Sequence, residues 1–325
     1  MVCAHDEEEN LKQLIPLLLE QQYATFEVII VNDRSNDATF DLLLEETKKD
    51  HRLRMVHVNR LPEHVDGKKY AITLGIKAAT YDWVLLTDAD CRPEGKNWIS
   101  GMSQYFQEPT QFVLGFSPYV RKEGFLNLFI RFESLLTAIQ YFSLAIIGLP
   151  YMGVGRNLAY RKSFFLDAKG FNKIIGVTGG DDDLFVNEHA TGKNTAVCLD
   201  GGAAVYSTPK STWRSFFHQK IRHLSVGKKY RFIHRFLLGT FMLSWIFTWI
   251  LAAMLLILNP VVHYGMIGVF VFRSLVLTIV LHACTRRFRQ NFETWTIPFL
   301  DFVFSIYYIS TGLVALFTKK IQWKK

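Results

Sequence analysis

Residues 83–90 read Trp-Val-Leu-Leu-Thr-Asp-Ala-Asp, and this stretch decides how the rest of the chain is interpreted. An apolar run of this length between polar residues predicts a strand that is buried on both faces. Asp88 and Asp90 follow at its carboxyl end, which is where open α/β sheets bind their ligands. Along a regular strand the two carboxylates would share one face, about 7 Å apart. The pattern therefore predicts a binding site at this strand end.

Two anions this close repel each other, so a proton or a cation is expected between them. A divalent cation, Mg²⁺ or Mn²⁺, completed by substrate phosphates suits a pair of carboxylates. A strand-end turn with two solvated aspartates is the alternative interpretation, because an Asp-x-Asp pattern is short.

The segments before residue 83 alternate between strand and helix patterns. Strands are predicted at 1–4, 26–31 and 53–58, and the helices between them include 38–48 and 65–79. This order indicates a mostly parallel sheet with right-handed crossovers. Charged residues gather at the carboxyl ends of the strands: Glu7, Asp33, Lys68 close by, Asp88 and Asp90. Four charged strand ends at one edge predict a functional site.

The middle of the chain is less regular. A strand is predicted at 111–116, and the very apolar segment Gly124–Ile147 either lies at a membrane surface or packs against the enzyme. The glycines of 153–157, which read Gly-Val-Gly-Arg-Asn, indicate close approach of the backbone to a ligand, or a plain turn. They do not form a dinucleotide-binding fingerprint, because G-x-G-x-x-G is not present there.

Two further segments are candidates for chemistry. Asp181, Asp182 and Asp183 follow two glycines, and they either cap a helix or supply a general base whose pKa is set by its neighbours. Residues 213–230 predict a basic amphipathic helix that contains Gln219, Arg222 and His223. A cationic face resting on lipid headgroups is the alternative for that helix.

Composition narrows the class of protein. The chain has 325 residues, 50% of them hydrophobic, and a net charge of +8. The basic excess suits nucleic acid, an anionic membrane or a phosphate-bearing substrate, and its clustering around apolar segments favours the membrane over nucleic acid. The four cysteines have no paired spacing, which predicts reduced thiols and a cytosolic catalytic side. No signal peptide precedes the first predicted strand, which leaves a missing upstream segment as an expectation.

Three segments near the end are long and apolar enough to cross a hydrocarbon core of about 30 Å: 236–258, 264–284 and 296–317. The second carries Arg273 and the third carries Asp301, and we expect these two charges to pair. Basic residues before the first segment and between the second and third predict that both flanks are cytoplasmic, with the link 259–263 outside. The lysines of 319–325 conflict with this topology, so the third segment is re-entrant or the rule fails, and the side of the tail stays open.

Taken in order, the motifs resemble those of the membrane-attached inverting glycosyltransferases of family 2. The matching segments are Ala4-His5-Asp6-Glu7, with Asp6 where Asn is usual, Val31-Asn32-Asp33-Arg34-Ser35, Lys68 with Ala71, Asp88-Ala89-Asp90, Gly180-Asp181-Asp182, and Gln219–His223, with His223 where Trp is usual. The resemblance implies a GT-A fold, which is an α/β Rossmann-like domain with a mostly parallel sheet, at 1–230. An all-α transmembrane region would follow at 231–325.

The resemblance also implies roles. Ala4, Glu7, Asp33, Lys68, Asp88 and Ala89 would bind the nucleotide-sugar, Asp90 a divalent cation, and Asp182 beside Asp181 would be the catalytic base. Gln219, Arg222 and His223 would lie on the acceptor or diphosphate side. The expected reaction is inverting transfer from a nucleotide-sugar, a UDP-sugar by preference, to a lipid or lipid-linked acceptor at the cytoplasmic face of a bacterial inner membrane. A processive polysaccharide synthase and an inactive membrane scaffold are the alternatives; the sugar, the acceptor and the oligomeric state stay open.

Overall fold

The structure is a computed structural model and describes residues 1–258 and 263–317. The chain divides into two compact units. The first comprises residues 1–120 and 140–209, and the second comprises 121–139 together with the described part of 210–321. The lysines of the tail and most of the link 259–263, on which the topology prediction depends, lie outside the described residues. The predicted domain boundary at residue 230 stays a prediction.

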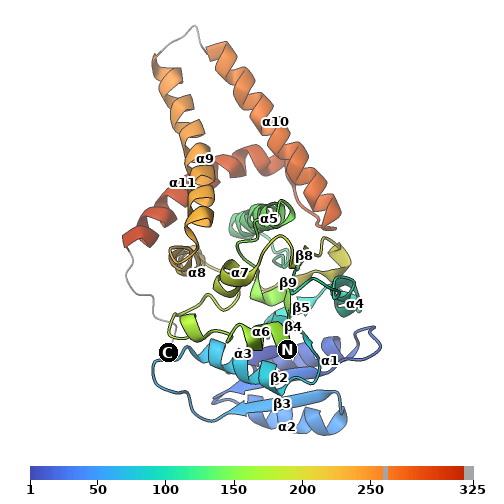
Figure 1. The fold of residues 1–325 in the computed structure, drawn as a ribbon. Helices are drawn as coiled ribbons and strands as arrows, with labels where there is room; N and C mark the ends of the chain where they lie inside the picture. Colours follow the sequence, from blue (N-terminus) through green and yellow to red (C-terminus); the bar gives the residue numbers. More distant parts are fainter. Residues whose placement is uncertain (259–262, 318–325) are drawn as a thin grey trace. The chain divides into compact units, whose positions relative to one another are not determined.

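The first unit is built on a seven-stranded mixed sheet with the order β3-β2-β1-β4-β7-β6-β8 (Figure 1). Its strands are β1 (Val2–Ala4), β2 (Val28–Asp33), β3 (Leu53–Val58), β4 (Trp83–Asp88), β6 (Phe112–Leu114), β7 (Leu158–Arg161) and β8 (Thr195–Val197). The strands β3, β2, β1 and β4 are parallel. The predicted alternation of strands and helices is therefore confirmed, and so is the mostly parallel α/β fold class.

Strand β7 enters the sheet beside β4 in the antiparallel direction, with Leu86 opposite Leu158 and Trp83 opposite Arg161. This arrangement places the residues just before β7 beside the carboxyl end of β4. Strand β6 then pairs with β7, also antiparallel. The predicted strand 111–116 is shorter in the structure, where β6 covers 112–114. Strands β5 (Cys91–Pro93) and β9 (Val205–Ser207) form a separate two-stranded sheet.

The helices of the first unit follow their apolar patterns. Helix α1 (Glu8–Leu19) buries Leu11, Leu14, Ile15 and Leu18, the face that the sequence predicts. Helices α2 (Thr39–Lys49), α3 (Gly67–Ala78), α4 (Trp98–Ser103), α6 (Lys162–Asp167) and α7 (Asp183–His189) complete this unit with three short 3₁₀ turns, η1 (Gly155–Asn157), η2 (Asn172–Ile174) and η3 (Gly201–Ala203). Helix α3 begins two residues later than predicted, because the Asp66 side chain caps it by accepting from the backbone N–H of Lys69.

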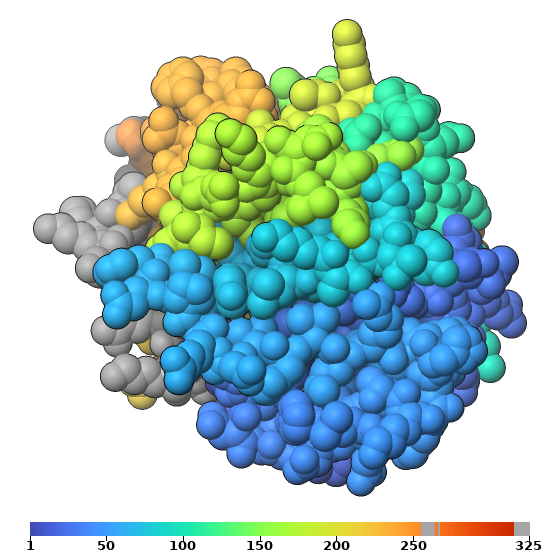
Figure 2. Space-filling view, turned by 60° about the horizontal axis from the view of Figure 1, so that its bottom comes forward, coloured from blue at the N-terminus to red at the C-terminus, as the bar shows by residue number. Residues whose placement is uncertain are grey.

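The segment after α6 lies along α3. The backbone N–H of Asp66 donates to the carbonyl of Ile175 at 2.7 Å. Figure 2 shows the green surface of this segment beside the cyan surface of residues near α3. The contact joins residues more than a hundred positions apart, and it brings the approach to α7 next to the start of α3.

The second unit is helical. It contains the first part of α5 (Phe125–Ile146), together with α8 (Trp213–Gly227), α9 (Phe232–Leu258), α10 (His263–Arg287), η5 (Thr294–Thr296) and α11 (Ile297–Phe317). In this unit Phe129 packs edge-on against Phe216 and Tyr307, with ring centroids 6.1 Å and 5.0 Å apart. The last part of α5 belongs to the first unit, where the Tyr141 hydroxyl donates to the carbonyl of Gly115 at 2.8 Å. The predicted strand-free helical region after residue 230 is thus confirmed.

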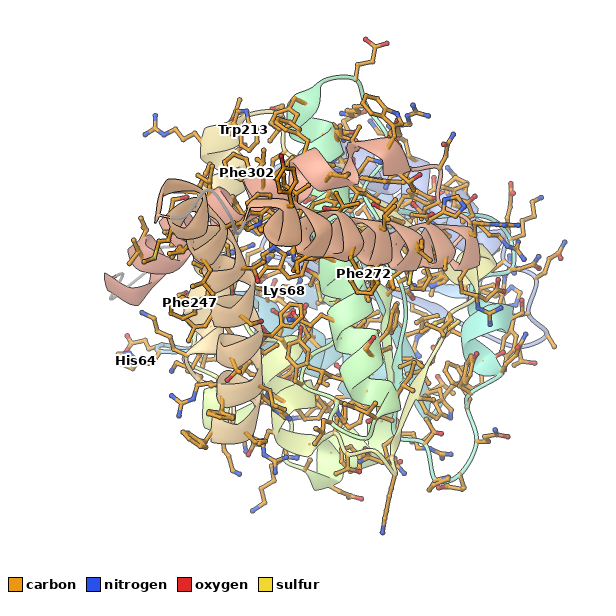
Figure 3. All side chains as sticks on the ribbon, turned by 90° about the horizontal axis from the view of Figure 1, so that it is seen from above. His64, Lys68, Trp213, Phe247, Phe272 and Phe302 are labelled. Carbon is orange, nitrogen blue, oxygen red and sulfur yellow. The ribbon has the colours of Figure 1, made fainter. Side chains whose placement is uncertain are left out.

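Within residues 1–258 and 263–317, four helices are long and apolar enough to cross a membrane, by length and composition. Three of them, α9, α10 and α11, match the segments predicted from the sequence, with α11 beginning one residue later than predicted, and α5 is the fourth. Phe247, Phe272 and Phe302 stand exposed on α9, α10 and α11 (Figure 3). Exposed aromatic side chains on such helices are expected where lipid, rather than water, is the solvent.

The two charges in these helices pair as predicted. The guanidinium of Arg273 makes two hydrogen bonds to the carboxylate of Asp301, one of them 3.0 Å long from Nη2 to Oδ1. Asp301 is 1% exposed, and the guanidinium lies 5.0 Å from the ring centroid of Trp245. The pair is therefore buried within the second unit.

Candidate active site

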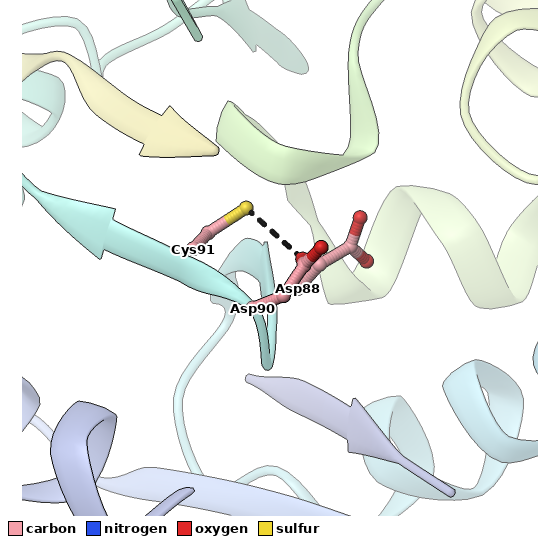
Figure 4. A group of neighbouring side chains, drawn as sticks. All are labelled: Asp88, Asp90 and Cys91. Atoms are coloured by element: carbon pink, nitrogen blue, oxygen red, sulfur yellow. Dashed lines mark hydrogen bonds between the residues drawn. The ribbon is translucent and has the colours of Figure 1, made fainter. Parts of the chain in front are cut away.

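The carboxyl end of β4 brings three ligand-type side chains together. One ligand atom each of Asp88, Asp90 and Cys91 lies within 4.8 Å of the others (Figure 4). This is closer than the spacing expected on a regular strand. The strand ends at Asp88, Ala89 turns the chain, and β5 begins at Cys91. The turn therefore folds the two carboxylates toward one point.

The donor set of this group suits a hard cation. The Cys91 thiol is fully buried, and burial together with Asp88 raises its pKa, so it stays protonated and is a poor ligand. Its S–H donates to Oδ1 of Asp90 at 3.6 Å instead. Two carboxylates with room for phosphate oxygens match the preference of Mg²⁺ and Mn²⁺. Asp90 and Asp88 therefore fit the predicted divalent cation.

Lys68 joins this group to the Asp-Asp segment. Its Nζ lies 2.9 Å from Oδ1 of Asp88 and 3.2 Å from Oδ2 of Asp181. Burial alone would lower the pKa of Lys68, but Asp181 and Asp88 raise it well above its ordinary value, so the ammonium stays charged. Lys68 thus links two motifs that are far apart in the sequence, and its predicted role at the diphosphate stays a prediction.

Asp182 sits at the start of α7, where its side chain caps the helix. Its Oδ2 accepts from the backbone N–H of Gly155 at 2.7 Å, and its Oδ1 accepts from the N–H of Asp183 at 2.8 Å. Burial and the neighbouring charge of Asp181 raise its pKa. The capping alternative and the general-base prediction are therefore compatible, because one carboxylate can serve both.

The pKa of Asp181 is shifted in the opposite direction to that of Asp182. Burial alone would raise its pKa, but Lys68 and Lys69 lower it below its ordinary value. Asp181 is therefore an anion that pairs with Lys68, while Asp182 is the more basic carboxylate. Two adjacent carboxyl groups whose pKa values are shifted in opposite directions are typical of active sites in which each group has a different catalytic role.

A buried lysine holds the loop that leads to this pair. Lys69 is 0% exposed, and its Nζ donates to the carbonyls of Val177 and Gly179, both at 2.6 Å. Gly179 and Gly180 adopt φ values of +75° and +79°, which favour glycine. Lys69 thus holds the left-handed glycine turn that leads to Asp181, and it is an addition to the predicted site residues.

A buried amide fixes the turn that supplies Gly155. The side chain of Asn157 donates to the carbonyls of Phe116 and Ala203 at 2.8 Å and 2.9 Å, and accepts from the Trp98 indole at 2.9 Å. A Cβ on Gly115 would come within 2.7 Å of this amide, so the contact needs glycine there. These hydrogen bonds hold the turn at 153–157, where the backbone of Gly155 approaches the Asp182 side chain. The predicted approach of these glycines to a ligand stays a prediction.

The remaining residues that are predicted to bind the nucleotide-sugar lie at or after the ends of β1 and β2. Asp33 is nearly buried, and Arg34 donates to both of its oxygens at 2.8 Å and 3.1 Å. A Cβ on Gly67 would lie 2.8 Å from this guanidinium, so α3 begins directly against the pair. Arg34 is an addition to the predicted residues.

Two further predicted residues lie at and after the end of β1. Ala4 is buried there. The Glu7 carboxylate accepts a hydrogen bond from the Asn10 amide, and burial raises the pKa of Glu7.

The acceptor-side candidates belong to the second unit. Gln219, Arg222 and His223 lie on α8, where the neighbouring Lys220 pairs with Glu133 of α5 at 2.5 Å. The side-chain oxygen of Gln219 is buried without a hydrogen-bond partner among the described residues. Their predicted role at the acceptor or diphosphate stays a prediction.

Comparison with known proteins places the chain in a family. The model of the family described as "Glycosyl transferase family 2" matches residues 1–165, about half of the chain. The protein therefore belongs to glycosyl transferase family 2, as the motifs predict.

Among its relatives is a poly-β-1,6-N-acetyl-D-glucosamine synthase of Staphylococcus epidermidis, 35% identical over 92 residues, which are 28% of this chain and 21% of that protein. A second, the probable glycosyltransferase YdaM of Bacillus subtilis strain 168, is 23% identical over 236 residues, covering 68% of this chain and 53% of its own length. The chain thus matches at most about half the length of these relatives.

The fold also resembles a solved structure, the mannosyltransferase PcManGT from Pyrobaculum calidifontis in complex with GDP-Man and Mn²⁺. The two share a TM-score of 0.58 at 16% identity, over 98% of this chain and 86% of that one. The likeness supports the GT-A fold of the first unit.

Proposed function

We propose that this protein transfers a sugar from a nucleotide-sugar, a UDP-sugar by preference, to a lipid or lipid-linked acceptor, with inversion at the anomeric carbon. The observation that carries the proposal is the bridge of Lys68 between Asp88 and Asp181, with the more basic Asp182 directly beside it. A cation-binding pair, a fixed positive charge and a base are the parts that such a transfer needs.

Asp182 accepts the proton of the acceptor hydroxyl, and the resulting oxygen nucleophile attacks the anomeric carbon. The bond between that carbon and the diphosphate oxygen breaks, and its electron pair stays on the diphosphate. Lys68, freed from part of its bridge, stabilises the charge of the leaving group. The cluster supplies a base without a separate nucleophile, so a single displacement with inversion follows.

Asp90 and Asp88 would hold the divalent cation. A bound Mg²⁺ or Mn²⁺ supplies positive charge to the departing diphosphate. Lys68 already neutralises part of Asp88, so Asp90 is the carboxylate left to bind the cation most directly. The Cys91 thiol donates to Asp90 and is a softer ligand than Mg²⁺ and Mn²⁺ prefer, so the two carboxylates are the proposed ligands.

The acceptor proposal rests on the helices. Among the described residues four of them have the length and composition of membrane spans, and basic residues lie at the start of α9 and at the end of α10. A catalytic unit held at a membrane surface suits an acceptor that is itself embedded there. The basic flanks support a cytoplasmic catalytic side of a bacterial inner membrane.

The test uses the full chain in detergent with Mn²⁺ and a panel of UDP- and GDP-sugars. Thermal stabilisation by one nucleotide-sugar identifies the donor, and NMR of the product determines the anomeric configuration. Retention of the donor's configuration would exclude the single displacement. Absence of binding, hydrolysis and transfer across the whole panel would support the inactive-scaffold alternative instead.

A processive polysaccharide synthase is the second candidate, and the similarity to the staphylococcal synthase over 92 residues favours it. Gel analysis of product length decides between the two. A ladder of long products with limiting acceptor indicates polymerisation, and a single added sugar indicates one transfer per acceptor.

A further inference from the structure

One arginine ends strand β7 and another lies just before it, and the two differ in the partners of their positive charge. Arg161, at the end of β7, stacks 5.0 Å from the ring centroid of Trp83. It also lies 3.4 Å from Asp82 and 3.0 Å from Glu108. Its charge therefore has two carboxylate partners, as is usual for a partly buried guanidinium.

Arg156, just before the other end of β7, makes the same kind of stack without a carboxylate. Its guanidinium lies 4.6 Å from the ring centroid of Tyr119, and Nη2 reaches the carbonyl of Ser117 at 3.5 Å. Within the part of the chain that the structure describes, no carboxylate lies at ion-pairing distance from it. Its contacts are therefore a ring face and a backbone carbonyl, and a phosphate would give the guanidinium a direct anionic partner.

The position of Arg156 follows from the strand pairing beneath it. Tyr119 pairs with Ser207, and Ser207 pairs with Cys91 in the two-stranded sheet. At the usual strand spacing, Tyr119 is about 10 Å from Cys91, which directly follows Asp90. Burial alone would lower the pKa of Arg156, but Tyr119, Cys91, Asp88 and Asp90 raise it, so the field of the aspartate pair reaches the guanidinium.

The residue before it contacts the base. Gly155 donates its N–H to Asp182, so Arg156 is one residue from the atom that holds the proposed general base. The turn does not need the arginine for its shape, because the three side-chain hydrogen bonds of Asn157 already fix it. Arg156 therefore carries a positive charge that the aspartate pair influences, and it directly follows the residue that contacts Asp182.

We propose that Arg156 is a phosphate-binding residue of this active site, and that it holds a phosphate of the donor diphosphate or of a lipid-phosphate acceptor. The planar guanidinium presents paired N–H donors that match a phosphate, and its weak hydration suits a partly buried site. The stack on Tyr119 leaves the edge of the guanidinium available for such contacts. This proposal rests on the nucleotide-sugar transfer proposed above.

The variants are Arg156→Gln and Arg156→Lys, with Arg161→Gln as the matched control, since Arg161 stacks in the same way but already has carboxylate partners. Calorimetry with the full chain in detergent measures binding of UDP and GDP in the presence of Mn²⁺. Fluorescence titration measures binding of a short-chain isoprenyl phosphate, with the corresponding isoprenol as the uncharged probe. Thermal melts verify that each variant is folded.

If the donor supplies the phosphate, Arg156→Gln weakens nucleoside diphosphate binding by about 10–100-fold, and Arg156→Lys recovers part of the loss. If the acceptor supplies it, diphosphate binding stays within twofold, and the preference for isoprenyl phosphate over isoprenol falls by the same factor. Arg161→Gln should change neither.

Unchanged binding of both phosphate probes in Arg156→Gln, with the wild-type protein binding at least one of them, overturns the role of Arg156 and leaves the proposed function standing. A wild-type protein that binds neither UDP, GDP nor isoprenyl phosphate overturns both proposals. If Arg156→Gln does not fold, Arg156→Lys tests the proposal instead. The lysine ammonium can still contact the Tyr119 ring but cannot donate two parallel hydrogen bonds to a phosphate, so binding of the phosphate probe should weaken measurably.

Discussion

The backbone N–H of Gly155 donates a hydrogen bond to Oδ2 of Asp182 over 2.7 Å. The bond joins a turn before β7 to the start of α7, and it aims one oxygen of the carboxylate at a fixed donor. The other oxygen caps the helix. A base whose orientation is set by two backbone groups keeps its geometry when the side chains around it change.

Replacing Asp182 by Asn should lower kcat by about 10²–10⁴, because general-base assistance is worth that much. The amide oxygen can still accept from Gly155, so the fold and nucleoside diphosphate binding should persist. Steady-state kinetics and calorimetry measure the two effects separately. The control is Asp167→Asn, an exposed aspartate at the end of α6. Turnover near that of the wild-type protein in Asp182→Asn would falsify the assignment of the base.

The pH profile of kcat should fall on the acid side as Asp182 takes up a proton. Its pKa is raised from an ordinary value of 3.8, so the fall should begin at a higher pH than for an unperturbed aspartate. A general base works only when it is deprotonated, so kcat should decrease as the pH is lowered. Measurement of kcat between about pH 4 and 8 tests this. A fall in kcat with an apparent pKa at or below the ordinary aspartate value would contradict the raised pKa of Asp182.

Replacing Lys69 by Met should both destabilise the protein and move that acid limb upward. The carbonyls of Val177 and Gly179 would lose a charged donor, at a cost of about 1–3 kcal/mol in the free energy of unfolding. Loss of a positive charge near Asp181 and Asp182 makes protonation of the pair easier, so the limb shifts to higher pH. Thermal melts and pH profiles report the two effects. Lys77→Met, on the exposed last turn of α3, should produce neither.

Removal of divalent cations with EDTA should abolish transfer and weaken nucleoside diphosphate binding by at least about tenfold, because two carboxylates would then face the phosphates without a counter-charge. Added Mn²⁺ or Mg²⁺ should restore both. Asp90→Asn should reproduce the loss in the presence of metal. Activity that survives EDTA unchanged would exclude the cation role of Asp90.

The Arg273–Asp301 pair should behave as a buried ion pair. Arg273→Leu alone leaves the 1% exposed carboxylate of Asp301 without its partner, and about 3–5 kcal/mol of stability should be lost. The double variant Arg273→Leu/Asp301→Leu should recover most of that loss, since no unpaired charge remains. Unfolding in detergent compares the three proteins. Equal stability of the single variant and the wild-type protein would show that the pair is not structurally important.

The sequence predicts the strand ends well because their signal is local. Asp33, Lys68 and Asp88 each follow an apolar run or open a helix, and the parallel order of β1, β2 and β4 then brings their ends to one edge of the sheet. Periodicity within a dozen residues is enough for such predictions.

What the sequence does not predict are contacts between distant segments. The hydrogen bonds of Lys69 to Val177 and Gly179 span more than a hundred residues, and the antiparallel entry of β7 beside β4 has no local pattern. The proximity of Cys91 to the aspartate pair depends on the turn at Ala89, which a regular strand geometry does not contain. Arg34 lies inside a predicted motif, so its pairing with Asp33 could have been found from the adjacent charges.

The bridge of Lys68 has a consequence for the order of substrate entry. One ammonium serves an aspartate on the donor side and an aspartate next to the base, so an incoming diphosphate must compete for it. Arrival of the donor would then draw the ammonium from Asp181 and leave Asp182 with a larger proton affinity when the acceptor docks. Initial-rate kinetics should therefore show an ordered mechanism in which the nucleotide-sugar binds before the acceptor. A random order of binding would show that Lys68 does not couple the nucleotide-sugar site to the base.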